Sequence, residues 1–244
     1  MSASVPAAVI VLAAGEGTRM KSSIPKVLNP VGGETMLGHV ITAARELAPR
    51  RLIVVAGHGR GQVAAELAGR APDVTVVVQE RRGGTGHAVR IVLEAVGQIH
   101  GTLLVTYADT PLLRASTLES LTAAHTAAGA AATVLTTVLP DPAGYGRIIR
   151  GADGGFEAIV EHSDATDEQR AITEINSGVY AFSGALLADA ISGCRPTTSR
   201  ARSTSPTRSA FCARTATRSP ACAAATRRRS WASTTRPSWP GPAG

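Results

Sequence analysis

The sequence has 244 residues, and its 25 Lys and Arg against 18 Asp and Glu give a formal net charge of +7. This length allows one large or two small α/β domains with a sizeable core. No apolar run approaches the roughly 20 residues of a membrane span, and no basic segment precedes the first apolar run, as a signal peptide would require. We therefore expect a cytoplasmic protein with no membrane partner.

The charge is distributed unevenly along the chain. Ten of the 25 basic residues, all of them Arg, lie in residues 194–244, which contain no acidic residue. Residues 1–193 therefore carry 15 basic and 18 acidic side chains, a net charge of −3. We divide the chain into a domain of residues 1–193 and a tail of residues 194–244.

Residues 1–193 alternate between apolar runs typical of buried strands and apolar spacings typical of helices. The predicted strands are residues 7–14, 51–57, 74–79, 102–109 and 132–139, and the predicted helices are residues 35–48, 62–70, 87–96 and 116–129. Strands that alternate with helices indicate an α/β fold with a mainly parallel sheet and right-handed crossovers. Ser116, with Glu119 three residues later, predicts a capping box at the start of the last of these helices.

The pattern changes after residue 140. Residues 147–161 resemble two strands joined by the turn sequence Ala-Asp-Gly-Gly, which predicts a hairpin. A further strand is predicted over residues 175–184 and the start of a helix over residues 185–191. We therefore expect a mixed sheet that is flanked by helices. The sequence contains no hexapeptide repeats of the β-helix kind.

A glycine-rich loop, VLAAGEGTRMKSSIPKVL (11–28), follows the first predicted strand. Gly15 and Gly17 suit a turn whose backbone N–H groups bind phosphate. Arg19 could bond to two phosphate oxygens at once, and Lys26 could supply a mobile point charge. The loop lacks both the third glycine of a dinucleotide fingerprint and the Gly-Lys-Ser/Thr of a P-loop. A tight turn with solvated basic residues is therefore the alternative interpretation.

Asp109 stands at the end of the predicted strand 102–109. In open α/β sheets, ligands bind beyond the carboxyl ends of the strands. A lone carboxylate at that place suits Mg²⁺, which takes few protein carboxylates and keeps waters and substrate phosphates as its other ligands. The alternative is that Asp109 caps the next helix.

Other polar residues also follow or interrupt predicted strands. Gln79 could bind a base edge through paired hydrogen bonds, with backbone groups of Gly84 and Thr85 beside it. Glu161 and Asn176 lie next to apolar runs and could bind sugar hydroxyls. The alternative for all of them is an ordinary polar turn.

Together these segments resemble the uridyltransferase domain of the bifunctional bacterial enzyme that makes UDP-N-acetylglucosamine. The resemblance covers about four-fifths of the chain, and the segments GYGRI, EHSDATDEQ and EINSG distinguish it from thymidylyl- and cytidylyltransferases, which share mainly the first loop. It implies a Rossmann-like nucleotidyltransferase fold. The segments that carry it, in chain order, are LAAGEGTRMKSSIPKVL, GGTGHA, YADTPLL, GYGRI, IVEHSDATDEQ and EINSGVYAF.

The resemblance implies a reaction in which UTP and N-acetylglucosamine 1-phosphate give UDP-N-acetylglucosamine, a precursor of the peptidoglycan cell wall, and pyrophosphate, with Mg²⁺ as cofactor. Ser163 stands where the family usually has Lys, which leaves no charge role at that position. The implied site residues are Leu12, Ala13, Ala14, Gly15, Gln79, Gly84 and Thr85 for uridine, Arg19 for the leaving pyrophosphate, Lys26 for the reacting phosphates, Asp109 for Mg²⁺, and Gly146, Glu161 and Asn176 for N-acetylglucosamine.

The tail departs from the resemblance. Residues 194–244 are rich in Arg, Ser, Thr, Ala and Pro and contain no Ile, Leu, Val or Asn, so we expect them to be disordered. The family would here supply a Gly-Val-Asn with a second Mg²⁺ ligand and then a β-helical acetyltransferase domain. We weigh three origins for the tail: a basic segment for nucleic acid or anionic lipid, an ordinary linker, and a frameshift.

The frameshift can be tested on the codons. Joining the last base of each codon to the first two of the next lets residues 230–235 encode Leu-Gly-Val-Asn-Asp, and the single codon of Trp231 forces the glycine. Residues 200–207 likewise permit Gly-Glu-Val-Tyr-Leu-Thr-Asp, and both segments resemble the family. We favour the frameshift and expect an incomplete domain with impaired activity.

Two other functions are alternatives to the uridyltransferase. One is a nucleotide- or nucleic-acid-binding protein without turnover, for which the tail would supply the charge, although we do not expect a nucleic-acid partner. The other is a different sugar-1-phosphate nucleotidyltransferase. Because the family trimer forms largely through the β-helix, we expect this chain to be a monomer.

Overall fold

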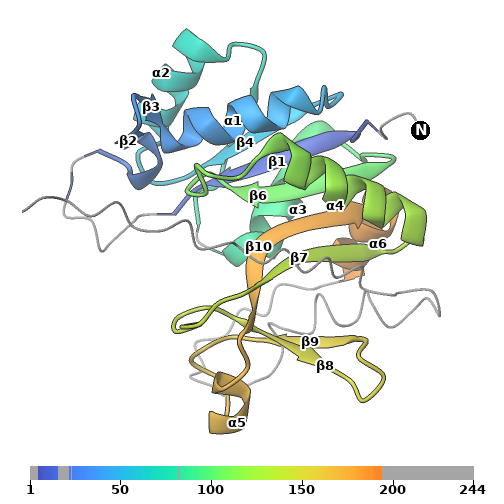
Figure 1. Cartoon of the computed structure of the whole chain (residues 1–244). Helices are drawn as coiled ribbons and strands as arrows, with labels where there is room; N and C mark the ends of the chain where they lie inside the picture. Colours follow the sequence, from blue (N-terminus) through green and yellow to red (C-terminus); the bar gives the residue numbers. More distant parts are fainter. Residues whose placement is uncertain (1–4, 16–21, 23, 82, 194–244) are drawn as a thin grey trace, which may run out of the picture.

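The structure, a computed structural model, describes residues 5–15, 22, 24–81 and 83–193. Arg19 and the tail of residues 194–244 lie outside these described ranges. The phosphate role of Arg19 and the disorder of the tail therefore stay predictions. Figure 1 shows the course of the described chain from the first strand to the last helix.

The elements follow one another closely. In chain order they are β1 (Ala8–Ala13), the 3-10 helix η1 (Lys26–Leu28), β2 (Pro30–Val31), β3 (Glu34–Thr35), α1 (Met36–Glu46), β4 (Leu52–Ala56), α2 (Arg60–Arg70), β5 (Thr75–Val78), α3 (Gly84–Val96), β6 (Thr102–Tyr107), α4 (Ala115–Ala128), β7 (Ala132–Val138), β8 (Arg147–Arg150), β9 (Phe156–Val160), α5 (Asp167–Arg170), β10 (Glu174–Ser183) and α6 (Gly184–Gly193).

The main sheet has eight strands in the described part of the chain. Its order is β5-β4-β1-β6-β10-β8-β9, and β7 pairs with β10 off this path. β5, β4, β1 and β6 run parallel to one another. β10 runs antiparallel to β6, β7 and β8, and β9 runs antiparallel to β8. The predicted mixed sheet and the predicted hairpin are both confirmed, and each antiparallel pair of this main sheet includes a strand that begins after residue 130.

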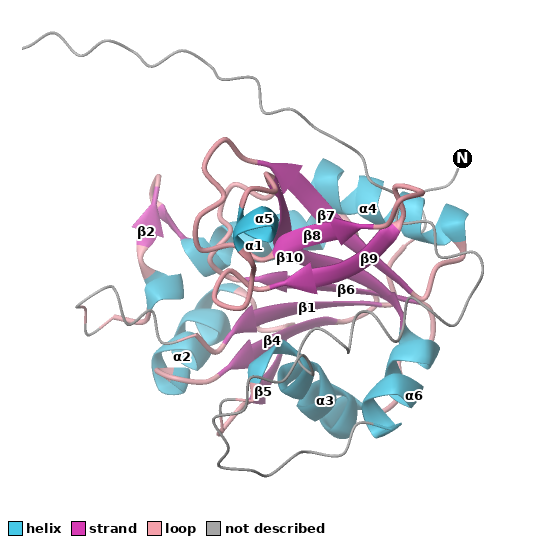
Figure 2. Ribbon diagram, turned by 90° about the horizontal axis from the view of Figure 1, so that it is seen from below, coloured by secondary structure: helices cyan, strands magenta, loops and turns pink. Residues whose placement is uncertain are grey.

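Helices cover both faces of the parallel half, as Figures 1 and 2 show. Along β1, alternate residues point to opposite faces because a strand has a period of two residues. Val9 and Val11 pack with α1, α2 and α4 in one core cluster, whereas Ile10 and Leu12 pack with α3 and α6 in the other. Each fully buried Val or Ile contributes about 1.5–3 kcal/mol, which explains why β1 is apolar along its whole length.

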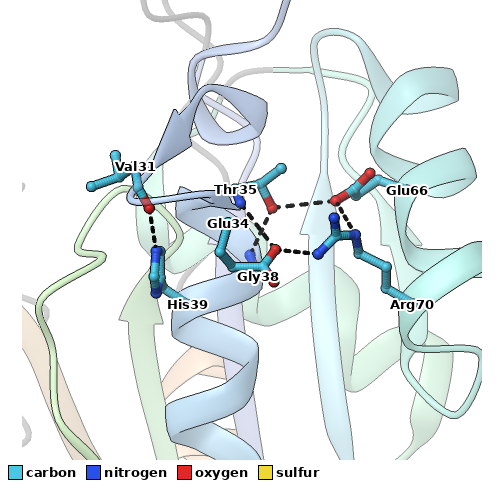
Figure 3. A network of polar contacts seen from close by, with 7 residues as sticks. All are labelled: Val31, Glu34, Thr35, Gly38, His39, Glu66 and Arg70. Atoms are coloured by element: carbon cyan, nitrogen blue, oxygen red, sulfur yellow. Dashed lines mark hydrogen bonds and ion pairs between the residues drawn. The ribbon is translucent and has the colours of Figure 1, made fainter.

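A network of polar side chains fixes the short β2–β3 hairpin that follows the glycine-rich loop (Figure 3). The Thr35 hydroxyl caps α1 by accepting a hydrogen bond from the Gly38 N–H at 3.0 Å, and it donates to Glu66 on α2. Arg70 pairs with both Glu66 and Glu34. The Glu34 carboxylate occupies the space that a Cβ on Gly38 would take, so a larger residue at this position would displace that carboxylate from the network. The network holds the hairpin, and with it η1, against α1 and α2.

The predicted capping box at Ser116 is wrong. α4 begins at Ala115, its N-cap is Arg114, and no side chain caps it. The Ser116 carbonyl instead accepts a hydrogen bond from the Ser120 hydroxyl within the helix. The two reciprocal hydrogen bonds of a capping box occur at α5, between Thr166 and Gln169. None of the helices in the described ranges has the length and apolar character needed to cross a membrane.

Candidate functional site

The first predicted site residues gather where the parallel strands end. The Leu12 carbonyl accepts a hydrogen bond from Ala108 N–H at 3.0 Å, so β1 and β6 end side by side. A Cβ on Gly57, after β4, would lie 2.8 Å from the Ala14 Cβ. The side chains of Leu12 and Ala13 are buried in the sheet, so these two residues could contact a ligand only through their backbone. This edge is where ligands bind in open α/β folds.

Lys26 and Asp109 meet at this edge although 83 positions separate them. The Lys26 Nζ lies 2.7 Å from the Asp109 Oδ2, and each side chain is 36% exposed. Lys26 begins η1, whose turn is fixed by the Asn29 side-chain amide, a donor to the carbonyls of Pro25 and Lys26. The structure thus places a cation and a carboxylate in direct contact beside the glycine-rich loop.

Asp109 does not cap a helix. The N-cap of α4 is Arg114, five positions further on. Asp109 instead lies in a turn that is closed by the Thr110 hydroxyl, a donor to the Tyr107 carbonyl at 2.8 Å. This excludes the alternative interpretation and leaves its carboxylate facing Lys26.

The donor set around Asp109 decides which metal would fit. Within the described ranges, no group of three or more His, Cys, Asp or Glu side chains is placed to hold a metal ion. A single carboxylate cannot provide the three or four protein ligands of a zinc site. It does suit Mg²⁺, which completes its shell with waters and substrate phosphate oxygens.

Gln79, Gly84 and Thr85 form a second group at the same edge. The Gln79 N–H donates to the Ala56 carbonyl at the end of β4, and its side-chain Nε2 lies 3.4 Å from the Gly84 carbonyl. Gly84 begins α3 with a φ of +78°, a conformation that favours glycine. The Thr85 hydroxyl lies 2.9 Å from the Tyr107 hydroxyl. These contacts join α3 to the ends of β4 and β6.

Gly146, Glu161 and Asn176 form a third group. The Asn176 N–H donates to the Gly146 carbonyl at 2.9 Å. A Cβ on Gly146 would lie 3.5 Å from both carboxylate oxygens of Glu161. Three predicted residues from β10, the start of β8 and the end of β9 are thus brought together. Arg147 supports this group, because its buried guanidinium donates to the carbonyls of Tyr145 and Arg170.

A bulge in β10 connects this third group to the other two. Between Asn176 and Tyr180 the strand advances four residues while β7 advances two. Gly178 lies in the bulge with a φ of +79°, and a Cβ there would lie 2.3 Å from the Tyr107 ring. The Asn176 side chain bridges the bulge by accepting from Gly178 N–H and donating to the Tyr180 hydroxyl. Tyr107 therefore touches Gly178 with its ring and Thr85 with its hydroxyl.

Arg150 and Glu174 brace the start of β10. The Arg150 guanidinium donates to both carboxylate oxygens of Glu174, at 2.8 and 2.7 Å. This side-chain hydrogen bonding raises the pKa of Arg150 above its ordinary value. Thr136 of β7 donates to the same carboxylate at 2.7 Å. The brace fixes the strand two residues before Asn176.

Every predicted site residue in the described ranges thus belongs to one of three connected groups. Sequence reasoning missed Tyr107, Gly178 and His87, which connect or support these groups. The segments YAD, NSG and GTGHA contain them. The contacts of Tyr107 and Gly178 join distant parts of the sequence, and His87 contacts Gln79 only because α3 turns back against the end of β5. The one sequence signal for Tyr107 is its own position, as an aromatic residue directly before Ala-Asp at the end of a predicted strand.

Comparisons with known proteins place this geometry in context. The chain matches the family model described as the MobA-like NTP transferase domain over residues 9–231. It is 59% identical over 197 residues to the bifunctional protein GlmU of Streptomyces coelicolor, and this match covers 80% of this chain and 41% of that protein. GlmU of Thermobifida fusca is 56% identical over 195 residues, which covers 78% and 40%. This chain spans about two fifths of the length of the curated relatives it matches.

Two solved structures share the fold. A Bacillus anthracis protein assigned as a glucose-1-phosphate thymidylyltransferase superposes with a TM-score of 0.60 at 21% identity, covering 77% of this chain and 75% of that chain. HddC from Yersinia pseudotuberculosis gives a TM-score of 0.56 at 20% identity, covering 75% and 79%. At these identities the likeness concerns the fold alone, and it confirms the Rossmann-like nucleotidyltransferase fold.

Proposed function

Because the chain belongs to the MobA-like NTP transferase family, we propose that it transfers the uridylyl group of UTP to N-acetylglucosamine 1-phosphate. The products would be UDP-N-acetylglucosamine and pyrophosphate. The identity of 50–59% to proteins named GlmU supports this choice within the family. The observation that carries it is the meeting of the three groups of site residues around Tyr107 at one edge of the sheet.

The nucleotide occupies the parallel half of the sheet in this proposal. The backbone from Leu12 to Gly15 and the Gly84–Thr85 turn offer N–H and carbonyl groups to the uridine, and Gln79 offers a side-chain amide. These groups stand on the ends of β1 and β5 and on the first turn of α3. The phosphates would then extend toward Lys26 and Asp109 and the predicted position of Arg19.

The chemistry demands positioning and charge neutralisation more than covalent work by the protein. A phosphate oxygen of the sugar phosphate attacks the α-phosphorus of UTP, the bond to the bridging oxygen breaks, and pyrophosphate leaves. Lys26 exchanges its contact with Asp109 for the reacting phosphates and neutralises their charge. Asp109 is the residue that would hold Mg²⁺, which when bound supplies charge neutralisation and orients the phosphate oxygens.

The sugar occupies the antiparallel half. Glu161 can accept hydrogen bonds from sugar hydroxyls. The missing side chain of Gly146 leaves room directly in front of that carboxylate. Asn176 shares its backbone with the bulge that touches Tyr107, so the sugar lies beside the nucleotide.

Pyrophosphate release tests the proposal. The chain is incubated with UTP, N-acetylglucosamine 1-phosphate and Mg²⁺, and with other nucleoside triphosphates and sugar 1-phosphates in parallel. We expect release that needs both substrates and that is fastest with this pair. A faster reaction with another pair would assign a different sugar-1-phosphate nucleotidyltransferase. Binding of UTP with no release from any pair would favour a binding protein without turnover.

The assembly and location of the chain follow from the same proposal. We propose that these 244 residues act in the cytoplasm and that they are monomeric. Light scattering tests the second point, with a mass near 25.0 kDa expected. A mass near three times that value would contradict it.

A further inference from the structure

The Gln79 side chain is held by two partners on the first turn of α3. Its Nε2 lies 3.4 Å from the Gly84 carbonyl and 2.8 Å from Nδ1 of His87. Within the described residues, Oε1 of the same amide has no hydrogen-bond partner. The two ends of the amide therefore differ sharply: one is bonded to the protein and the other is left for a ligand.

The chemistry of the partners fixes which end is which. A backbone carbonyl can only accept, so the end of the amide that faces Gly84 must be its NH₂ group. That NH₂ group then donates to His87 as well, so Nδ1 of His87 accepts and the proton of the neutral ring is on Nε2. A flipped amide would place Oε1 against the Gly84 carbonyl and lose that hydrogen bond.

The His87 ring is itself fixed by packing. A Cβ on Gly83 would lie 2.5 Å from Cβ and Cγ of His87 and 2.9 Å from Nδ1. The ring therefore rests directly against the Gly83 backbone, in space that only a glycine leaves open. Gly83 has a φ of −125°, which any residue can adopt, so its backbone conformation does not require glycine. The close contact with the His87 ring is what requires glycine at this position.

We propose that His87 is a positioning residue that sets the base specificity of the site by orienting the Gln79 amide. The inference rests on the proposed function, because it takes the ligand of Gln79 to be the base of the nucleotide. With its NH₂ group held by α3, Gln79 presents an acceptor. Uracil has an N3–H donor on its pairing edge, whereas cytosine has a bare N3 acceptor there. Oε1 therefore attracts uracil and repels cytosine.

Three substitutions test the role of His87. His87→Leu removes the acceptor, His87→Asp keeps an acceptor oxygen at the position of Nδ1, and Gly83→Ala displaces the ring without removing it. Dissociation constants are measured by calorimetry on the full chain for UTP, CTP and 5-methyluridine triphosphate, each with Mg²⁺. The affinity ratio within one variant cancels any general loss of binding or stability, which a merely structural role would produce.

The expected results concern ratios of affinity. The preference for UTP over CTP falls about tenfold or more in His87→Leu and in Gly83→Ala, the size expected for the loss of one oriented hydrogen bond. It is retained in His87→Asp. The ratio of UTP to 5-methyluridine triphosphate stays unchanged in all variants, because both bases carry the same N3–H edge.

The outcomes separate this inference from the proposed function. An unchanged UTP-to-CTP ratio in His87→Leu or Gly83→Ala overturns the role of His87, even if the chain releases pyrophosphate from UTP. A wild-type chain that binds UTP and CTP equally also overturns it. A chain that shows the predicted ratios without turnover would leave the inference intact and overturn the proposed function.

Discussion

Single residues in this site gain their roles from contacts that the fold makes over long sequence distances. Lys26 and Asp109 are the clearest case: Lys26 Nζ lies 2.7 Å from Asp109 Oδ2, and each side chain is 36% exposed. A surface ion pair of this kind adds only about 0–1 kcal/mol to stability. In our proposal its value therefore lies in reactivity, because it keeps a mobile cation and a carboxylate at the place where the phosphates would bind.

Replacing Asp109 should separate these two contributions. We expect Asp109→Asn to slow pyrophosphate release by about a hundredfold or more, since it removes the carboxylate that would hold Mg²⁺ beside the reacting phosphates. The melting temperature should change little. The matched control is Asp73→Asn, which breaks an exposed ion pair with Arg45 away from the site and should leave the rate within about twofold. Equal losses in the two variants would contradict the role of Asp109.

Gly178 is required for a steric reason as well as a conformational one. Gly178→Ala places a Cβ 2.3 Å from the Tyr107 ring at a φ of +79°. Gly154→Ala is the matched control, because Gly154 has a φ of +75° but nothing within 4 Å of its Cβ position. Left-handed strain costs both variants about 1–2 kcal/mol, and we expect crowding to cost Gly178→Ala about 1–3 kcal/mol more.

Urea unfolding of the two glycine variants measures that difference. Because the Tyr107 side chain touches the bulge of β10 with its ring and Thr85 with its hydroxyl, Gly178→Ala should also weaken binding of the sugar phosphate and of UTP. Gly154→Ala should affect neither affinity. If the free energy of unfolding fell by the same amount in both variants, crowding between Gly178 and Tyr107 would add nothing to the cost.

Whole elements were predictable from the sequence to very different degrees. β1, β4, β5 and β6 are continuous apolar runs, and local periodicity suffices to identify them. The bulge of β10 and the pairing of this strand with three others depend on distant residues, and no local pattern encodes them. α3 begins at Gly84, three residues before the predicted start, because tertiary contacts outweigh the low helix propensity of glycine.

The candidate site shows the same division. Asp109 and Gln79 were predictable, because polar residues at strand ends stand out in an apolar sequence. Tyr107 and His87 were not, because both occur in patterns that suit an ordinary strand end or helix turn. Their roles appear only when Thr85, Gly178 and Gln79 are brought to them by the fold.

The packing of α4 against β7 makes the stability of the protein depend on pH. His125 of α4 is 4% exposed, and its Nδ1 lies 2.9 Å from the Thr133 hydroxyl of β7. Burial lowers the pKa of His125 below its ordinary value of 6.5. The unfolded chain therefore binds a proton near pH 6.5 that the native protein takes up only at a lower pH. The free energy of unfolding falls as the pH drops through this window, by at most about 1.4 kcal/mol per pH unit.

Urea unfolding between pH 8 and pH 5 checks this dependence. His125→Asn keeps a hydrogen-bonding atom near the position of Nδ1 but cannot titrate, so its stability should fall less between pH 6.5 and pH 5. The two proteins should show parallel stability profiles above pH 7. Equal slopes below pH 6.5 would show that His125 does not cause the dependence.

At the scale of the molecule, the two substrates in our proposal divide between the two halves of one sheet. The parallel half, with helices on both faces, supplies Lys26, Gln79 and Asp109. The antiparallel half supplies Gly146, Glu161 and Asn176. Tyr107 stands at the end of β6, the strand on which the parallel half meets β10. The arrangement explains why one side chain can contact residues assigned to both substrates.

The tail of residues 194–244 also leads to a testable prediction about activity. We propose that they are read out of frame, and that the alternative frame would supply an Asn as a second metal ligand in addition to Asp109. A chain with these residues restored to the alternative frame should therefore release pyrophosphate at least about tenfold faster than the present chain. It should also reach half its maximal rate at a lower Mg²⁺ concentration, since a second ligand strengthens metal binding.

A chain of residues 1–193 provides the matched control for that comparison. We expect its rate of pyrophosphate release to lie within about twofold of that of the present chain. Its melting temperature should be the same, because the tail has too few apolar residues to add to a core. If the restored chain were no faster than either of the others, Asp109 would suffice for the metal and the frameshift would lose its functional consequence. If residues 1–193 alone were much slower than the present chain, the tail would contribute to activity as it stands, and the proposal of a frameshift would fail.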